Sequence, residues 1–484
     1  MRMSLAQAAQ AMQAQPSAGD LARTFCAVST DSRKVAPGEL FFALRGPKHD
    51  GHSFLRQAFA RGAVAAVVER WPNGGLPEKA DATLLKVHDS LRAIGELARQ
   101  ARQNLAARVA AITGTAGKTA TKAMSAAVCR RAVGQVFKGP VAATARSENN
   151  LVGVPLTLLN LKGDEEVVIL EMGMNALGEI ARLTEIADPD FGLITNIGLA
   201  HLKPSAQSIS LDASPSPLLS LEGVTQAKGE LWRGMRPEAT AVVNLDDPHV
   251  ARLAAERGGR QVRYSARPTE QAQVCCRTAR GLGLAGQELT LAAGGGFAKV
   301  NLAAAGAHQR ANAVAACALT FALGVPLTLI AQGLAEFAPL PMRGETRTLG
   351  ADTVVINDAY NANPVSMAAA LQMLAELPGT RRIAVLGDMR ELGDMSDEAH
   401  REIGRLAGAL KLDLLLAVGD FAAELALGAR RAGMEPSQIV VFETRAQLAD
   451  YLVSVLEPGD RVLLKASRAV ALETVLERLE KAQL

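Results

Sequence analysis

The sequence predicts an α/β protein of three domains, and three observations support this fold class. The chain has 484 residues, more than a single hydrophobic core usually organises. Hydrophobic residues make up 49% and charged residues 21%, with 43 glycines but only 3 Tyr, 2 Trp and 12 Phe, which favours helices packed on sheets over a β-sandwich. Apolar runs alternate with helix-like segments, and the alternation begins afresh after the proline-rich residues 338–341.

These patterns divide the chain into a small mixed α/β N-terminal domain (1–105), a central parallel-sheet domain (106–340) and a C-terminal Rossmann-like, doubly wound domain (341–484). The expected strands, in chain order, are 39–44, 63–68, 109–112, 167–170, 192–195, 241–244, 353–356, 383–386, 414–418, 439–442 and 461–464. Residues 203–220 are rich in Ser and Pro and are expected to form a surface loop.

Charge and targeting signals exclude several classes of protein. A formal net charge of +3 provides no broad electrostatic surface for nucleic acid or an anionic membrane, so an anionic ligand needs a local site. Residues 1–20 lack a signal-peptide core and predict a short amphipathic helix. The uncharged stretch 311–335 is interrupted at Gly324-Val325-Pro326, so two buried helices are expected in place of a membrane span. Five cysteines without a C-x-x-C pair fit a reducing, cytoplasmic location.

The strongest local motif is a glycine-rich turn between the expected strand 109–112 and a helix that starts near Lys118. Its residues are Gly114, Thr115, Ala116, Gly117, Lys118 and Thr119. In a phosphate loop, backbone N–H groups face phosphate oxygens, the lysine neutralises charge and the last hydroxyl can ligate Mg²⁺. The longer eight-residue pattern requires glycine where Ile112 stands, so spacing alone leaves an ordinary strand–turn–helix junction open.

Polar residues also follow other expected strands. Glu171 comes after strand 167–170 and His201 follows strand 192–195, and ligands of parallel sheets bind beyond the carboxyl ends of the strands. We therefore expect Glu171 and His201 to converge on a metal near the phosphates. Two further polar segments, 306–312 and 358–364, open helices, the second with Pro364 at its first position; taken singly, each is typical of a helix cap.

Together these residues resemble the Mur ligase family over nearly the whole chain. Its short phosphate loop, G-x-x-G-K-T, stands at 114–119, which accounts for Ile112. Further similar segments are 149–155, 171–173, 178–180, 195–196 and 200–202, and, in the first domain, 29–33, 37–41, Gly46, Asp50 and His52. The most discriminating are 358–364 with Ser366-Met367 and 385–389 with 391–393, which are similar to the members that add D-alanyl-D-alanine.

The resemblance implies an ATP-dependent ligase that joins D-Ala-D-Ala to UDP-N-acetylmuramoyl-tripeptide through an acyl phosphate, with ADP and phosphate as products. This is the last cytoplasmic step toward the nucleotide-pentapeptide precursor of peptidoglycan, which implies roles in cell-wall biogenesis, cell shape, division and the cell cycle. Expected ligands are ATP, the two other substrates and two Mg²⁺ ions, and a monomer is expected. Either meso-diaminopimelate or lysine fits as the third residue of the tripeptide.

The resemblance also implies residue roles. The catalytic set is Lys118, Lys228, Glu171 and His201. The metal ligands are Thr119, Glu171, His201 and a carbamylated Lys228. ATP is bound by residues 114–119, with Asn312 at the adenine, Asp358 at the ribose and Arg343 at the phosphates. The UDP-muramoyl peptide is assigned to Ser29, Thr30, Ser32, Arg33, Gly46, Asp50, Asn149 and Asn150, and D-Ala-D-Ala to Tyr360, Asn361 and Asn363. Taken alone, Lys228 would be read as a surface lysine, and 29–33 as a solvated turn.

Three positions depart from the family pattern. Ala120 replaces a hydroxyl residue after the phosphate loop. Ala466 replaces a glycine in 465–468, and it is unfavourable there if the backbone requires a positive φ. Residues 203–219 are an insertion beside the expected metal site, either a substrate lid or an inert loop.

Three other functions stay open from the sequence. Another amide ligase of the superfamily, adding an amino acid to a muramoyl peptide or glutamate to folate, is the nearest, and residues 358–364 argue against it. A P-loop switch or motor should lack the motifs of the first domain. A catalytically inactive binding module should not retain Lys118, Thr119, Glu171 and His201 together.

Overall fold

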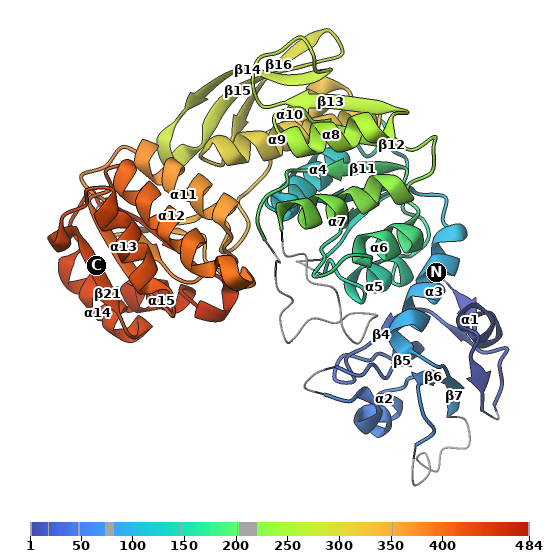
Figure 1. The fold of residues 1–484 in the computed structure, drawn as a ribbon. Helices are drawn as coiled ribbons and strands as arrows, with labels where there is room; N and C mark the ends of the chain where they lie inside the picture. The colour runs from blue at the N-terminus through green and yellow to red at the C-terminus, as the bar shows by residue number, and fades with distance from the viewer. Residues whose placement is uncertain are drawn as a thin grey trace.

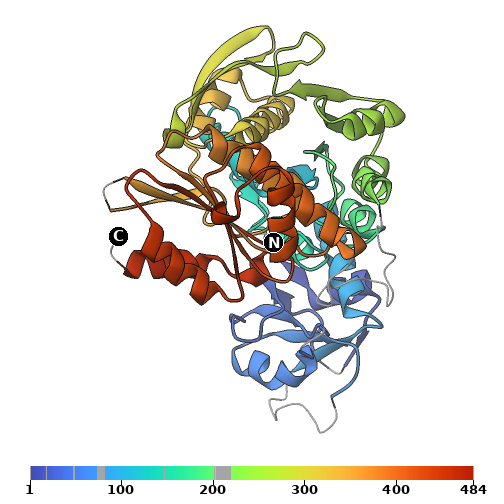
Figure 2. The same ribbon diagram turned by 60° about the vertical axis from the view of Figure 1, so that its left-hand side comes forward.

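The structure, a computed structural model, describes residues 2–17, 19–46, 49–72, 82–145, 148–200, 202, 220–350 and 352–482. Three bodies of helices and strands follow one another along the chain (Figure 1). The N-terminal body is blue, the central body runs from cyan to yellow, and the C-terminal body is orange to red. In the second view the C-terminal body overlaps the central one (Figure 2), and the two are in contact where residues 364–376 meet residues 307–322. The predicted three-part α/β fold is thereby confirmed.

The N-terminal body is built on a five-stranded sheet. Its strands, in spatial order, are β2 (Gln15–Pro16), β7 (Thr83–Lys86), β6 (Ala65–Val68), β5 (Glu39–Phe42) and β4 (Ala27–Ser29), with β1 (Met3–Ser4) and β3 (Thr24–Phe25) paired separately. Strands β4 to β7 are parallel. The helices are α1 (Leu5–Met12), α2 (Leu55–Ala60) and α3 (Ser90–Gln103). The expected N-terminal helix and strands 39–44 and 63–68 are confirmed, with both strands slightly shorter than predicted.

The central body contains a nine-stranded sheet. Its strands, in spatial order, are β16 (Gly296–Leu302), β15 (Gln287–Ala293), β14 (Val274–Gly281), β13 (Gln261–Ser265), β12 (Thr240–Asn244), β11 (Phe191–Ile194), β8 (Arg108–Thr113), β10 (Val167–Glu171) and β9 (Val141–Ala143). Its helices are α4 (Lys118–Arg131), α5 (Gly153–Leu159), α6 (Glu179–Ala187), α7 (Leu221–Gly234), α8 (Pro248–Arg257), α9 (Ala307–Ala322) and α10 (Leu327–Ala335). Strands β8, β10, β11 and β12 are parallel, as predicted. Strands β9, β13 and β14 extend the parallel sheet, and β15 and β16 add an antiparallel extension to β14; the sequence patterns predicted none of these five strands.

The uncharged stretch 311–335 forms the buried parts of α9 and α10, with the break at Gly324-Val325-Pro326, so the prediction of two helices is confirmed. Within the described residues, no helix combines the length and the apolar character that crossing a membrane requires.

The C-terminal body is doubly wound around a six-stranded sheet. Its strands, in spatial order, are β17 (Glu345–Leu349), β18 (Thr353–Asn357), β22 (Arg461–Lys465), β19 (Arg382–Leu386), β20 (Leu414–Val418) and β21 (Ile439–Phe442), of which only β17 is antiparallel. Its helices are α11 (Pro364–Glu376), α12 (Ser396–Ala409), α13 (Ala422–Arg431), α14 (Arg445–Val455) and α15 (Glu473–Lys481). All five predicted strands are present. Short 3₁₀ helices cover Gly51–Phe54, Gly283–Ala285, Gly393–Met395, Pro436–Gln438 and Arg468–Val470.

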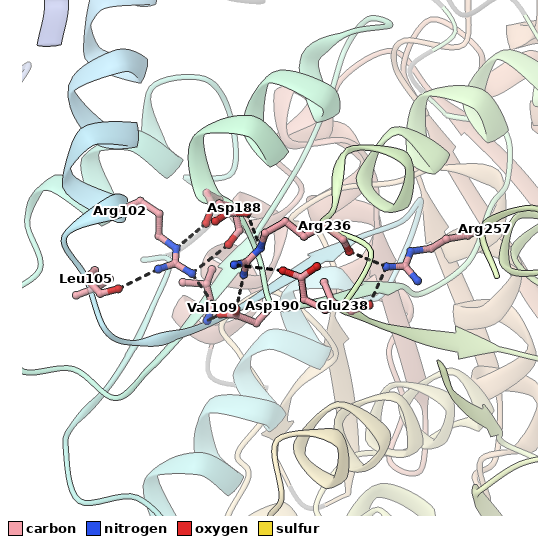
Figure 3. A network of polar contacts seen from close by, with 10 residues as sticks. Arg102, Leu105, Val109, Asp188, Asp190, Arg236, Glu238 and Arg257 are labelled. Carbon is pink, nitrogen blue, oxygen red and sulfur yellow. Dashed lines mark hydrogen bonds and ion pairs between the residues drawn. The ribbon is translucent and has the colours of Figure 1, made fainter. Parts of the chain in front are cut away.

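Helix α3 joins the first two bodies, and a buried arginine fixes its end to the central one (Figure 3). Arg102 is 8% exposed and donates to the carbonyls of Ala187 at 2.9 Å and Asp188 at 3.1 Å. It also donates to the Asp190 carboxylate at 3.2 Å, which accepts from Arg236 at 2.6 Å as well. These bonds hold the N-terminal body against residues 187–190 of the central body, which lead into β11.

Replacing Arg102 by leucine removes the side-chain donor to the carbonyls of Ala187 and Asp188 and one of the donors to the Asp190 carboxylate. We expect the free energy for local opening of α3 to fall by about 2 to 4 kcal/mol, measured by native-state hydrogen exchange. The matched control is Arg99→Leu on the same helix, whose exposed ion pairs with Glu96 and Glu185 should contribute less than about 1 kcal/mol. Unchanged protection of α3 in Arg102→Leu would contradict this account of the junction.

Candidate active site

A cavity of about 590 Å³ lies at the carboxyl end of the central sheet, where the C-terminal body meets it. From the central body it is lined by the loop 115–119, Asn149, Asn150, Glu171, Asn196 and Asn312, and from the rest of the chain by Arg343, Asp358, Tyr360, Asn361, Asn363 and Lys465. Predicted site residues from widely separated segments therefore share one cavity.

The loop between β8 and α4 needs its two glycines. Gly114 has φ +141°, and a Cβ there would lie 2.0 Å from Thr195 Oγ1. Gly117 has φ +83°, and a Cβ there would lie 2.2 Å from Asn312 Oδ1. Both conformations and both close approaches favour glycine, so the turn is specified by its sequence. The predicted helix start at Lys118 is confirmed.

Lys118 is half-buried at the first position of α4. Its Nζ donates to the carbonyls of Gly114 at 2.7 Å and Thr115 at 3.2 Å. Burial lowers the pKa of Lys118, the Glu171 carboxylate raises it and the Arg343 guanidinium lowers it. The site thus holds two cationic groups close enough to interact, an arrangement suited to a polyanion such as a nucleotide phosphate chain.

Glu171 ends β10 and is only 1% exposed. Its Oε1 accepts from Thr119 Oγ1 at 3.1 Å and from Asn149 Nδ2 at 2.9 Å, and its Oε2 forms an ion pair with Lys122 Nζ at 3.1 Å. Burial raises the pKa of Glu171, but the ammonium groups of Lys122 and Lys118 and the bond from Asn149 hold it below its ordinary value. Two of the predicted metal ligands, Thr119 and Glu171, are therefore in contact, and the neighbouring ammonium groups favour the ionised form of Glu171.

Lys122 was not singled out from the sequence. It lies one helical turn after Lys118 on α4, and this i, i+4 spacing was the available signal.

Lys228 lies on α7 and is completely buried. The interpretation of Lys228, taken alone, as a surface lysine is therefore wrong. Its Nζ has no hydrogen-bond partner among the described residues. Burial lowers its pKa well below the ordinary value, and the charge of Lys118 lowers it further, against opposing effects from the carboxylates of Glu179, Glu230 and Glu171. A neutral amine in such surroundings is a nucleophile.

The fourth predicted catalytic residue, His201, and the insertion 203–219 lie outside the described residues. In the part of the chain that the structure describes, no three His, Cys, Asp or Glu side chains are grouped so as to hold a metal ion.

The nucleotide residues predicted from α9 and the interdomain linker meet at this cavity. Asn312 Oδ1 lies against Gly117, and Asn312 Nδ2 donates to Gln309 Oε1 at 3.2 Å. The Arg343 guanidinium stacks over the Tyr360 ring, 4.0 Å from its centroid, a cation–π contact that fixes both side chains.

Asp358 and its neighbours follow β18 in the C-terminal body. Asp358 Oδ2 accepts from the buried Lys465 Nζ at 2.6 Å, and Lys465 also donates to the Asn361 carbonyl at 3.1 Å. Asn363 caps α11 by accepting from the Ser366 amide at 2.8 Å, and its Nδ2 lies 3.5 Å from the Thr115 carbonyl. The cap of α11 thus touches the phosphate loop and links the two bodies at the cavity.

The residues assigned to the UDP-muramoyl peptide fall in two places. Ser29, Thr30, Ser32, Arg33, Gly46 and Asp50 follow the parallel strands β4 and β5, whose carboxyl ends share one edge of the N-terminal sheet. Asn149 and Asn150 instead line the central cavity.

Within the N-terminal group, several side chains already have protein partners. Arg33 has a side chain that is 79% exposed and pairs with Asp31. Asp50 accepts from His52 Nδ1 at 2.7 Å and from Arg70 Nη2 at 2.6 Å. Its carboxylate therefore already has two side-chain partners, which stabilise the loop around it.

The departures at Ala466 and Ala120 are accommodated. Ala466 is fully buried and is not among the described non-glycine residues with positive φ, so the concern about its backbone was unfounded. Ala120 lines the cavity with a methyl group where a hydroxyl was the family expectation.

Comparisons with known proteins identify the family of the chain. Family models match three segments: Mur ligase family, catalytic domain, over residues 24–102; Mur ligase middle domain over 112–320; and Mur ligase, glutamate ligase domain, over 342–468. The UDP-N-acetylmuramoyl-tripeptide--D-alanyl-D-alanine ligase of Escherichia coli (strain K12) is 36% identical over 461 residues, covering 95% of this chain and 94% of that protein. The protein of the same name from Bacillus subtilis (strain 168) is 33% identical, with coverages of 94% and 93%.

Solved structures are similar over the same length. A crystal structure of MurF from Acinetobacter baumannii has a TM-score of 0.86 at 31% identity and covers 99% of both chains. MurF from Thermotoga maritima in complex with ADP has a TM-score of 0.79 at 27% identity, covering 94% of this chain and 97% of that one. With full-length similarity in both sequence and structure, the chain belongs to the Mur ligase family.

Proposed function

We propose that this protein joins D-Ala-D-Ala to UDP-N-acetylmuramoyl-tripeptide, with cleavage of ATP to ADP and phosphate. The observation that carries the proposal is the shared cavity, in which the phosphate loop and the Thr119–Glu171 contact face Asp358, Tyr360 and Asn361 of the C-terminal body. The names of the curated relatives support the same substrates.

In the proposed reaction, the tripeptide carboxylate attacks the γ-phosphorus of ATP, the bond to the bridging oxygen breaks, and an acyl phosphate and ADP form. The dipeptide amine then attacks the acyl carbon, loses a proton and expels phosphate, which leaves an amide. Lys118 and the N–H groups of the loop stabilise the charge of the transferred phosphoryl group. No covalent enzyme intermediate is needed.

The residues present fit Mg²⁺. A threonine hydroxyl and an ionised carboxylate oxygen lie 3.1 Å apart at the cavity, and oxygen donors of this kind are the ligands that Mg²⁺ prefers. The buried Lys228 amine, whose Nζ has no hydrogen-bond partner among the described residues, fits the proposed ligand of the second Mg²⁺, because a neutral amine can add CO₂ and lose a proton to become an anionic carbamate. When bound, Mg²⁺ would neutralise phosphate charge as the carboxylate attacks. His201 is proposed as a further ligand.

We assign one substrate to each domain. Residues 1–105 bind the UDP-muramoyl part through Ser29, Thr30, Ser32, Arg33, Gly46 and Asp50, with Asn149 and Asn150 near the peptide. Residues 106–340 bind ATP, with Asn312 at the adenine and Arg343, just beyond them in the linker, at the phosphates. Residues 341–484 supply Asp358 to the ribose and Tyr360, Asn361 and Asn363 to D-Ala-D-Ala. The enzyme is proposed to act as a cytoplasmic monomer in peptidoglycan precursor synthesis.

Phosphate release tests this function. The enzyme is supplied with ATP, Mg²⁺ and a UDP-muramoyl tripeptide ending in meso-diaminopimelate or lysine, with D-Ala-D-Ala, single amino acids or no amine. We expect release that depends on D-Ala-D-Ala and on at least one tripeptide. Turnover of a shorter muramoyl nucleotide with a single amino acid, without turnover of the tripeptide, would assign the protein to another branch of the family.

A further inference from the structure

The two oxygens of Glu171 have different partners. Oε1 accepts from Thr119 and Asn149, and both of these residues line the cavity. Oε2 is buried and pairs with Lys122 Nζ at 3.1 Å. Lys122 is 5% exposed and is not among the residues that line the cavity. Lys122 therefore contacts the carboxylate from a buried position that is not part of the cavity lining.

Burying the charges of Lys122 and Glu171 costs free energy unless the two side chains stay paired. Lysine is rarely buried, and a buried carboxylate without a cation carries a large desolvation penalty. Lys118, the other nearby ammonium, donates to the carbonyls of its own loop. Among the described residues, Lys122 is therefore the cation that forms an ion pair with Glu171, and its place on α4 ties the carboxylate to the helix that follows the phosphate loop.

We propose that Lys122 is a positioning residue that anchors Oε2 of Glu171, so that Oε1 stays aimed at a divalent cation beside Thr119. This inference rests on the proposed role of Glu171 as a metal ligand. Partners behind a metal ligand commonly control its orientation, and losing one typically weakens metal binding by about 10- to 100-fold.

The test is direct binding of Mn²⁺, which takes the same oxygen ligands as Mg²⁺, to the full-length protein saturated with ADP. Free Mn²⁺ is followed by electron paramagnetic resonance, so no turnover is required. The variants are Lys122→Met, Lys122→Arg, Glu171→Gln and the double variant Lys122→Met/Glu171→Gln. Ser125→Ala is the matched control, since Ser125 is a fully buried polar residue of α4 whose hydroxyl has no partner in the described structure.

We expect the Mn²⁺ dissociation constant to rise about tenfold or more in Lys122→Met and less than about threefold in Lys122→Arg and Ser125→Ala. In the Glu171→Gln background, adding Lys122→Met should produce little further change, because the anchor acts through Glu171. A generally loosened α4 would lower the melting temperature without this dependence on Glu171. If Lys122→Met does not fold, Lys122→Gln, which keeps a donor without the charge, takes its place under the same expectations.

Unchanged or tighter Mn²⁺ binding in folded Lys122→Met would overturn the inference, since tighter binding would make Lys122 a competitor of the metal. An equal loss in the Glu171→Gln background would overturn it as well. If Glu171→Gln itself binds Mn²⁺ like the wild type, the metal role of Glu171 fails and this inference fails with it. If only the expectation for Lys122→Met fails, the inference about Lys122 is wrong and the proposed ligase function is unaffected.

Discussion

Lys118→Ala is expected to lower the rate of ATP-dependent ligation by about 10³-fold or more, because it removes the cation that is proposed to stabilise the developing charge of the phosphoryl group. The side chain makes its hydrogen bonds to carbonyls of its own loop, and the turn itself is set by Gly114 and Gly117. The fold should therefore survive the substitution. Phosphate release measures the first effect, and circular dichroism with thermal melting measures the second.

The control for this variant is Lys299→Ala, which removes an exposed lysine from β16, outside the proposed site. It should retain the activity of the parent enzyme. If Lys118→Ala still released phosphate at the parent rate with D-Ala-D-Ala and the tripeptide, the phosphate loop would not be the ATP site.

Lys228→Ala is expected to be inactive and to recover part of its activity when short carboxylic acids such as acetate are added. The proposed carbamate supplies an anionic oxygen pair, and the alanine variant leaves a buried space that a small carboxylate can enter. We expect a loss of about 10²-fold or more and a saturable rescue, measured by phosphate release against acetate concentration.

Two controls make the rescue specific. Acetate should not revive Lys118→Ala, which lacks a different group, and chloride at equal ionic strength should not revive Lys228→Ala. An alanine variant with full activity and no acetate dependence would refute the carbamate role.

Much of the fold was predictable because buried parallel strands appear as continuous apolar runs. The runs 383–386 and 461–464 became β19 and β22, which are almost completely buried at the centre of their sheet. Strands β14 and β16 were missed because they are only partly covered. Each carries several exposed residues, and these break up the apolar run that a buried strand would show.

The site was predictable where its residues follow parallel strands. Thr119 follows β8 and Glu171 ends the neighbouring strand β10, and their contact follows from that topology. The burial of Lys228 depends on how α7 packs. Even so, Lys228 comes four residues after Val224 and Leu231 comes seven residues after Val224. This spacing places all three residues on one apolar face of α7 and was a signal in the sequence. The engagement of Asp50 by His52 and Arg70 depends on loop geometry that no motif specifies.

The central claim is ligation through an acyl phosphate, and transfer of oxygen-18 tests it most directly. The reactive carboxylate of the UDP-muramoyl tripeptide is labelled, the enzyme is run with ATP and D-Ala-D-Ala, and the products are analysed by mass spectrometry. The account predicts a pentapeptide nucleotide that has gained the dipeptide, together with inorganic phosphate carrying the label. Unlabelled phosphate, or phosphate released without the pentapeptide nucleotide, would contradict it.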